Sequence, residues 1–187
     1  MLNTKLIIAS TRPGRKGPAV AAWIQELAKE HPELDVEVLD LATINLPFLD
    51  EANHPRLQQY EKQHTKDWSA KIAPAEAFIF VMPEYNFGFN APLKNAIDFL
   101  YREWQNKPVA LVSYGGVAAG LRAAQMIRPV LAAVSLVAIP EAVSVPQFTQ
   151  FINAEGKFVP NEMLTKSAHG VMKGLVKWGE VMKGLRG

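Results

Sequence analysis

The chain has 187 residues, of which 49% are hydrophobic and 20% are charged, and its formal net charge is +2 at pH 7. This balance predicts one globular domain over residues 1–187 and excludes a disordered or fibrous protein. There are no cysteines, which excludes disulfides, thiolate metal sites and cysteine-nucleophile enzymes such as phosphatases of related topology. Any redox reaction therefore needs a bound cofactor.

The charge and hydropathy patterns also limit the partners. Lysine and arginine are scattered among 18 acidic residues, so we expect no nucleic-acid partner. No apolar run approaches the roughly 20 residues that span a bilayer, and residues 1–5 lead into a strand rather than a signal-peptide core, so we expect a cytoplasmic protein without membrane contact. The four histidines show no paired ligand spacing, and no metal site is expected.

The first predicted unit is a strand, a loop and a helix. Residues 5–9 are short and apolar, as in a buried strand. Pro18 suits the first position of a helix, because its missing N–H needs no acceptor there. Apolar residues then recur at helical spacing until His31 and Pro32, where we expect the helix to end.

The loop between this strand and helix collects groups suited to an anion. It carries the hydroxyls of Ser10 and Thr11 and the cations of Arg12, Arg15 and Lys16. Because a helix N-terminus presents unpaired N–H groups and a partial positive charge, this loop predicts a phosphate site, the alternative being a solvated basic loop. The loop contains neither a Walker sequence nor a dinucleotide fingerprint.

The rest of the chain continues the alternation of strands and helices. Further strands are predicted at 36–41, 77–82, 108–113 and 135–139, the last extended by 143–145. Helices are predicted at 57–72, at 92–101, from the loop at 113–120 to about 133, and at 161–185. A small hairpin or excursion is predicted at 151–159 around Gly156. Met172, Met182 and Trp178 in the last helix are expected in the core rather than at a cofactor.

This alternation predicts an α/β fold with a parallel sheet and helices on both faces. The second strand has the polar alternation of an edge, whereas the fourth has almost no polar residue and must lie inside. We therefore expect a flavodoxin-like three-layer sandwich with five parallel strands in the order 2-1-3-4-5. The loops after the first, third and fourth strands would then converge at one edge of the sheet.

The other two converging loops are aromatic and glycine-rich, and the one after the third strand could also be an ordinary turn. The first carries Pro83, Glu84, Tyr85, Asn86, Phe87 and Gly88, and the second carries Ser113, Tyr114, Gly115 and Gly116. With the phosphate loop, they give a site with a cationic end and a flat, open end. FMN has matching parts, since its phosphate needs cations and its ring needs backbone N–H groups without bulky side chains.

Up to about Pro146 the chain resembles the NAD(P)H-dependent FMN reductases of flavodoxin-like fold, which include quinone and azo-dye reductases. The motifs that carry the resemblance are Ser10-Thr11-Arg12, Pro83-Glu84-Tyr85-Asn86 continuing to Leu93-Lys94-Asn95-Ala96-Ile97-Asp98, and Ser113-Tyr114-Gly115-Gly116. The chain departs from the usual family pattern at Ala9, where glycine is common, and at Asn90-Ala91, where Pro-Gly is common.

The resemblance implies roles for these residues. Ser10, Arg12 and the backbone of Lys16, Gly17, Pro18 and Ala19 would hold the FMN phosphate. Residues 83–88 and 113–116 would frame the isoalloxazine, and Arg12 or Arg15 could also attract a nicotinamide phosphate. Hydride would pass from NADPH or NADH to the flavin and then to a small-molecule electron acceptor such as a quinone, an azo compound or free flavin. No catalytic side chain is required.

The main alternative is a flavodoxin-type electron carrier or a redox-sensing flavoprotein that a protein partner reduces. Such carriers are typically acidic, unlike this chain. A response-regulator receiver would need an aspartate at the end of the third strand, where Met82 and Pro83 stand.

Aromatic residues beside the predicted site suggest self-association. Tyr85, Phe87 and Phe89 lie in one loop, and Phe99, Tyr101 and Trp104 follow in and after the next helix. We expect a lone subunit to leave much of this apolar surface exposed, the alternative being that Phe87 and Phe89 fold back onto the core. Related reductases are commonly dimers in which the partner helps to cover the flavin. We therefore expect a homodimer or a dimer of dimers, with the helix at 92–101 in the contact.

Overall fold

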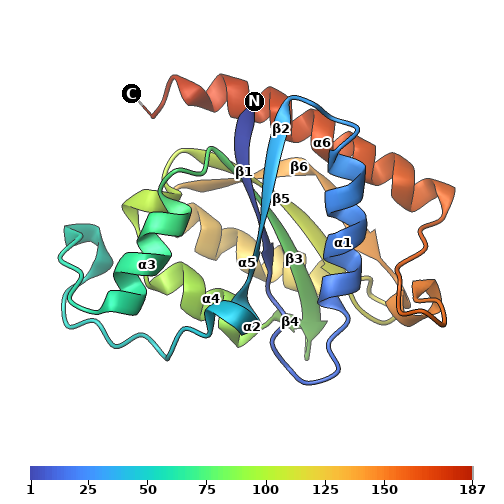
Figure 1. The fold of residues 1–187 in the computed structure, drawn as a ribbon, viewed down its shortest axis with the longest axis horizontal. Coiled ribbons are helices and arrows are strands. Elements are labelled where there is room, and N and C mark those ends of the chain that lie inside the picture. The colour runs from blue at the N-terminus through green and yellow to red at the C-terminus, as the bar shows by residue number, and fades with distance from the viewer. Residues whose placement is uncertain (187) are drawn as a thin grey trace.

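The computed structural model describes residues 1–186 and forms three layers around one parallel sheet (Figure 1). The strands are β1 (Leu2–Ile8), β2 (Leu34–Asp40), β3 (Ala77–Tyr85), β4 (Gly88–Phe89), β5 (Lys107–Tyr114) and β6 (Leu136–Val145). The longer helices are α1 (Gly17–Ala28), α3 (Gln63–Ile72), α4 (Ala91–Asp98), α5 (Leu121–Ala133) and α6 (Glu162–Lys183). The short ones are α2 (Leu41–Ile44) and the 3-10 turns Pro55–Leu57, Arg102–Trp104 and Phe148–Phe151.

The strand order is β2-β1-β3-β5-β6, and every neighbouring pair on this path is parallel. This confirms the predicted flavodoxin-like order, with β4 as an extra two-residue strand that pairs antiparallel with the end of β3. The ends of β1, β3 and β5 therefore lie side by side, as Ile8 pairs with Val81 and Met82 with Ser113.

The two faces of the sheet carry separate cores because successive side chains of a strand point to opposite sides. Along β3, Ile79 and Val81 belong to the core beneath α1 and α6. Phe78 and Phe80 belong to the core beneath α3, α4 and α5. Figure 1 shows α1 and α6 on one side of the sheet and α3, α4 and α5 on the other. All four side chains are fully buried, which explains the unbroken apolar run in the sequence.

Two predicted elements differ in the structure. The helix expected at 57–72 is a 3-10 turn and a separate helix α3, because Gln58 has a left-handed φ of 55° that ends the turn. The last strand is continuous from 136 to 145, but its pairing with β5 shifts register between Val109 and Leu111. On β6 the shift falls between Ala138 and Ala142, where Pro140 lies. Proline has no N–H to donate to a neighbouring strand, which is tolerated because β6 is at the edge of the sheet.

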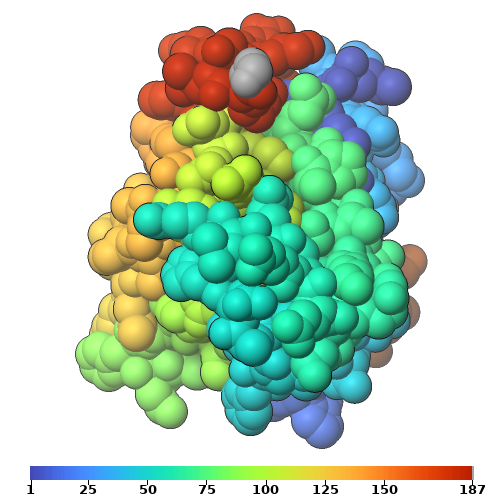
Figure 2. Space-filling model, turned by 90° about the vertical axis from the view of Figure 1, so that its left-hand side faces the viewer, coloured from blue at the N-terminus to red at the C-terminus, as the bar shows by residue number. Residues whose placement is uncertain are grey.

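The surface also differs from expectation. Phe99 and Trp104 are fully buried, and the Trp104 ring packs 5.0 Å from that of Phe78. The prediction that they form an exposed patch is therefore wrong, since both complete the core below α4. Figure 2 shows the segment between α2 and α3 spread over this side of the molecule. No helix within residues 1–186 is long and apolar enough to cross a bilayer.

The C-terminal part confirms two smaller predictions. Ile152 and Phe158 form an antiparallel bridge around Gly156, whose φ is +77°, so residues 151–159 are the expected small hairpin. Its Phe158 stacks on Trp23 of α1 with ring centroids 4.8 Å apart. Met172 and Met182 of α6 are buried in the structure, as their helical spacing indicated.

Candidate functional site

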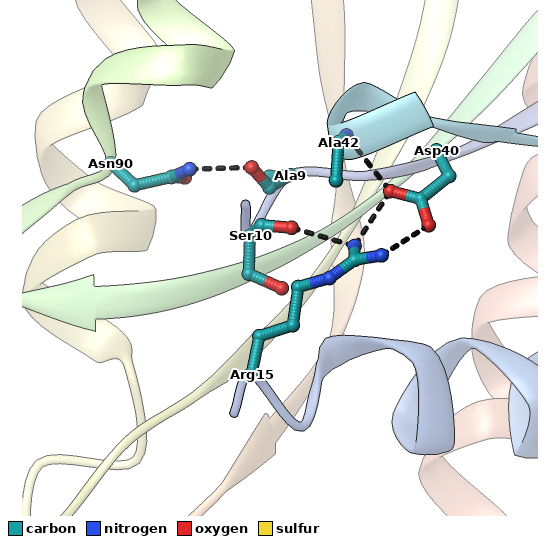
Figure 3. A network of polar contacts seen from close by, with 6 residues as sticks. All are labelled: Ala9, Ser10, Arg15, Asp40, Ala42 and Asn90. Atoms are coloured by element: carbon teal, nitrogen blue, oxygen red, sulfur yellow. Dashed lines mark hydrogen bonds and ion pairs between the residues drawn. The ribbon is translucent and has the colours of Figure 1, made fainter. Parts of the chain in front are cut away.

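The candidate site lies at the carboxyl edge of the sheet, where three loops meet as predicted. The Ala9 N–H donates to the Val81 carbonyl at 3.0 Å, which joins the end of β1 to β3. The Asn90 side-chain amide donates to the Ala9 carbonyl at 2.6 Å, which ties the start of α4 to the same point (Figure 3). Asn90 thus has a structural role at the position where the sequence departs from the family pattern. Such an edge, at a switch point of an open α/β sheet, is where ligands bind.

The phosphate loop leads from Ser10 at the end of β1 into the N-terminus of α1. Ser10 is fully buried and its Oγ has no hydrogen-bond partner. A β-carbon added at Gly17 would overlap this Oγ and lie 2.9 Å from the hydroxyl oxygen of Tyr114. Lys16, the residue before α1, makes no side-chain cap. The first N–H groups of α1 therefore face a loop whose buried hydroxyl lacks a partner, as an anion-binding cradle requires.

Arg15 has a different environment from the other two cations of the loop. Its guanidinium forms two bonds of 2.6 Å to the carboxylate of Asp40 and one of 2.8 Å to the Ser10 carbonyl (Figure 3). Asp40 also accepts from the Ala42 N–H at 3.0 Å and so caps α2. Burial opposes ionisation of Asp40, but these hydrogen bonds outweigh it and hold the pKa of the carboxyl below its ordinary value. Arg15 therefore fixes the phosphate loop to the end of β2, and its charge is already neutralised.

We expect Asp40→Asn to lower the free energy of unfolding by about 2 kcal/mol at pH 7, because it removes a bidentate charge-assisted pair. Since the folded-state pKa of Asp40 is depressed, this stabilisation is present above the unfolded value of 3.8 and is lost as the pH falls through the folded value. Urea unfolding of both proteins should therefore show a difference that is constant from pH 7 to about 4 and shrinks below.

Asp98→Asn is the matched control, because Asp98 forms an exposed i,i+4 pair with Lys94. Such pairs contribute under about 0.5 kcal/mol. Equal losses in the two variants would show that the Arg15–Asp40 pair does not hold the loop.

Arg12 connects the phosphate loop to the last residue of β3, which extends three residues beyond the predicted end at 82. Its Nε donates to the Tyr85 hydroxyl at 3.2 Å, and both side chains are exposed to solvent. The contact brings together two residues that are 73 positions apart in the sequence. Arg12 and Lys16 are thus the cations of this loop whose charge remains accessible at the site.

The loop after β3 is a tight hairpin turn rather than an open wall. Asn86 and Phe87 have positive φ values of 48° and 71°, and they link β3 to β4. Two successive positive φ angles are those of a type I′ turn, which is unusual for a bulky residue such as Phe87. The turn leaves Phe87 69% exposed beside the site.

Glu84 is committed to protein contacts. Its carboxylate accepts from the Arg122 N–H and guanidinium, each at 3.1 Å, and so caps the start of α5. The guanidinium of Arg122 also lies 3.9 Å from the centroid of the Phe87 ring. Sequence analysis missed Arg122 because 38 positions separate it from Glu84. Glu84 therefore holds the start of α5 through Arg122.

The loop after β5 folds back tightly on its own strand. Ser113 Oγ donates to the Ala119 carbonyl at 3.2 Å, and Gly120 has a φ of +80°. Gly116 has open space around it, with no atom within 4 Å of an added β-carbon. Tyr114, by contrast, is buried, and burial raises the pKa of its phenol to about 12. Its side chain thus points toward Gly17 and away from the open part of the loop.

A cleft of about 490 Å³ lies beside this edge, and sequence analysis did not predict it. Its walls come from the phosphate loop, from the segment that follows β2 and from the start of α4. The lining residues are Thr11, Leu41, Ala42, Asn45, Leu46, Pro47, Phe48, Ala91, Pro92 and Asn95. Asn95 holds this wall in place by donating to the Pro47 carbonyl and accepting from the Leu49 N–H.

These features fit FMN on this structure's own geometry. The phosphate end has an unpaired buried hydroxyl, a helix N-terminus and two accessible cations, and the ring end has one glycine, Gly116, with open space around it. Within residues 1–186, no three histidine or carboxylate side chains are grouped as metal ligands. The fold and site together define a flavodoxin-like protein with a site for a phosphate-bearing flat cofactor.

The comparisons with known proteins specify the family. The family model for NADPH-dependent FMN reductase matches residues 3–150, and the chain belongs to this family. It is 45% identical over 121 residues to a NAD(P)H-dependent FMN reductase of Nectria sp, covering 62% of this chain and 60% of that protein. It is 33% identical over 148 residues to a NADPH:quinone oxidoreductase of Arabidopsis thaliana, and the match covers 72% of this chain and 70% of that protein.

A solved structure supports the fold. The NAD(P)H:(acceptor) oxidoreductase FerB of Paracoccus denitrificans superposes with a TM-score of 0.77 at 22% identity, covering 97% of this chain and 99% of that one. The match to the Nectria protein spans less than two thirds of that relative's length.

Proposed function

We propose that this protein is an FMN-dependent NAD(P)H oxidoreductase that delivers electrons to a small acceptor such as a quinone, an azo compound or free flavin. The observation that carries the proposal is the phosphate loop, where the buried Ser10 hydroxyl without a partner faces the N-terminus of α1. Relatives named as FMN reductase, quinone oxidoreductase and azoreductase support the activity and the class of acceptor.

The roles of the residues follow from their environments. Ser10, Arg12 and the backbone from Lys16 to Ala19 hold the phosphate, while Arg15 stays bound to Asp40 and fixes the loop. Residues 83–88 and 113–116 frame the ring, with the side chain of Glu84 holding α5 rather than the ligand. When bound, FMN supplies the chemistry by accepting a hydride and passing electrons on. The protein contributes orientation and electrostatic stabilisation, and no side chain is assigned as an acid or base.

The proposal is tested by FMN binding and by NADPH oxidation without a protein partner. Titration should quench flavin fluorescence, and the loaded protein should oxidise NADPH or NADH when only a quinone is added. A folded protein that does not bind FMN would exclude this function. Binding of FMN with reduction only through a second protein would identify an electron carrier instead.

Arg12→Ala should weaken FMN binding about ten- to a hundredfold and leave riboflavin binding nearly unchanged, because a charge-assisted hydrogen bond to phosphate is worth roughly 1.5–3 kcal/mol. Fluorescence titration with the two flavins measures this difference. Arg128→Ala is the control, since Arg128 is also an arginine but belongs to α5 and not to these loops. Equal losses of affinity for FMN and riboflavin would show that Arg12 does not bind the phosphate.

The proposal includes a homodimer, with pairing of dimers as a further step. Because Phe99 and Trp104 are buried, the proposed contact moves from the helix at 92–101 to one group of exposed apolar residues around β4 and the first half of α5. They are Phe87, Val117, Leu121 and Met126, and each is at least half exposed. Apolar patches of this kind commonly mark interfaces.

Light scattering at micromolar concentration should therefore give at least twice the chain mass of 20.7 kDa. Leu121→Asp should reduce it to the monomer mass, because the substitution places a charge in the apolar contact. Val181→Asp, at an exposed valine of α6, should leave the mass unchanged. A monomeric wild-type protein would refute the dimer.

A further inference from the structure

Tyr114, the last residue of β5, is buried although the loop that follows it lies at the site. Gly116, two residues on, is exposed with open space around it, whereas the tyrosine is only 3% exposed. Its ring packs against Phe148 with centroids 5.1 Å apart. The hydroxyl oxygen lies 2.9 Å from where a β-carbon of Gly17 would be, which places the phenol beneath the phosphate loop.

Two buried hydroxyls thus lie against the same glycine. Ser10 Oγ also borders the missing β-carbon of Gly17, and neither hydroxyl has a hydrogen-bond partner among the described residues. Native proteins rarely leave buried polar groups unpaired, and those that remain usually indicate a ligand or a functional role. Since both are at the N-terminus of α1, an anion bound there is the acceptor that remains once the two hydroxyls bond to each other.

The chemistry of the pair suggests how it works. The phenol of Tyr114 remains protonated at neutral pH, so it can act as a donor. Ser10 Oγ is a nearby acceptor, because both hydroxyls lie within 3 Å of the place where a β-carbon of Gly17 would be. A serine hydroxyl has one proton and two lone pairs. If its oxygen accepts from a phenol, its proton is left to point at a phosphate oxygen, and the two bonds strengthen each other.

We propose that Tyr114 is a positioning residue for the phosphate end of the cofactor: in the loaded site its hydroxyl would donate to Ser10 Oγ and thereby turn the Ser10 proton toward the phosphate. Gly17 is the element that permits this arrangement, since any side chain there would separate the two hydroxyls. The inference rests on the proposed function, because the ligand is the phosphate of FMN.

A double-mutant cycle tests the inference. The dissociation constants of FMN and riboflavin are measured for the wild type, Ser10→Ala, Tyr114→Phe and the double variant. Tyr114→Phe should weaken FMN binding about three- to tenfold and leave riboflavin binding unchanged, since only FMN has the phosphate. In the Ser10→Ala background, Tyr114→Phe should cause no further loss.

Tyr101→Phe is the matched control, because the Tyr101 hydroxyl accepts from Arg56 at 2.9 Å and belongs to another part of the molecule. It should leave both dissociation constants unchanged. Inorganic phosphate provides a readout without flavin, since it should raise the thermal midpoint of the wild-type apoprotein more than that of Tyr114→Phe.

The outcomes separate this inference from the proposed function. If Tyr114→Phe weakens both flavins equally, or if its effect persists in Ser10→Ala, Tyr114 contributes only packing and the inference is overturned while FMN binding stands. Ser10→Ala alone is a second test. If it weakens the binding of riboflavin as much as that of FMN, Ser10 does not face the phosphate. A wild-type protein that does not bind FMN would overturn both.

Discussion

Gly17→Ala is expected to weaken FMN binding by a hundredfold or more, because the added methyl would overlap Ser10 Oγ and come within 3.3 Å of Ile8 Cγ2. Ile8, the last residue of β1, is buried and cannot yield easily, and Ser10 Oγ must rotate away from Gly17 or the loop must move. Either change separates the Ser10 hydroxyl from the start of α1, and the phosphate then loses at least two hydrogen bonds of roughly 1.5–3 kcal/mol each. Fluorescence titration with FMN measures the loss.

The control for this experiment is Gly184→Ala, at a glycine whose added β-carbon has no atom within 4 Å. It should leave the FMN dissociation constant unchanged. Riboflavin binding should fall less than FMN binding in Gly17→Ala, because the loop contacts the phosphate. An FMN affinity within threefold of the wild type would refute the assignment of the phosphate to this loop.

Gly120→Ala should lower the free energy of unfolding by about 3 kcal/mol, because two costs add at one position. The residue has a φ of +80°, which a β-carbon disfavours, and an added β-carbon would lie 2.6 Å from Ser113 Cβ and 2.7 Å from the Tyr114 nitrogen. The second contact is with backbone at the end of β5, which cannot move without breaking the sheet. A thermal midpoint lower by roughly 10 °C is expected for a chain of this size.

Gly170→Ala is the matched stability control, since Gly170 lies within α6 with no atom within 4 Å of an added β-carbon. Alanine is favoured over glycine inside a helix, so this variant should be as stable as the wild type or up to about 1 kcal/mol more stable. A Gly120→Ala protein as stable as the wild type would show that the loop after β5 is not held in the tight conformation.

The identity of the fold was predictable because its signals are local. The apolar runs at 77–82 and 108–113 indicate buried parallel strands, and the periodicity of α1 and α6 indicates helices that each bury one face. Right-handed crossovers then leave few arrangements, which is why the sheet order and the convergence of the three loops were predicted correctly. The composition of the loops also indicated a phosphate at one end and a flat ring at the other.

Sequence by itself therefore determined the sheet, its order and the segments that form the site. The tertiary structure decided which side chains in those segments are free. Arg15 is paired with Asp40, 25 positions away, and Glu84 with Arg122, 38 positions away. Tyr114 turns under the phosphate loop, and Trp104 turns into the core. The physical reason is that backbone periodicity depends on near neighbours in the chain, whereas ion pairs and side-chain burial depend on which loops the completed fold brings together.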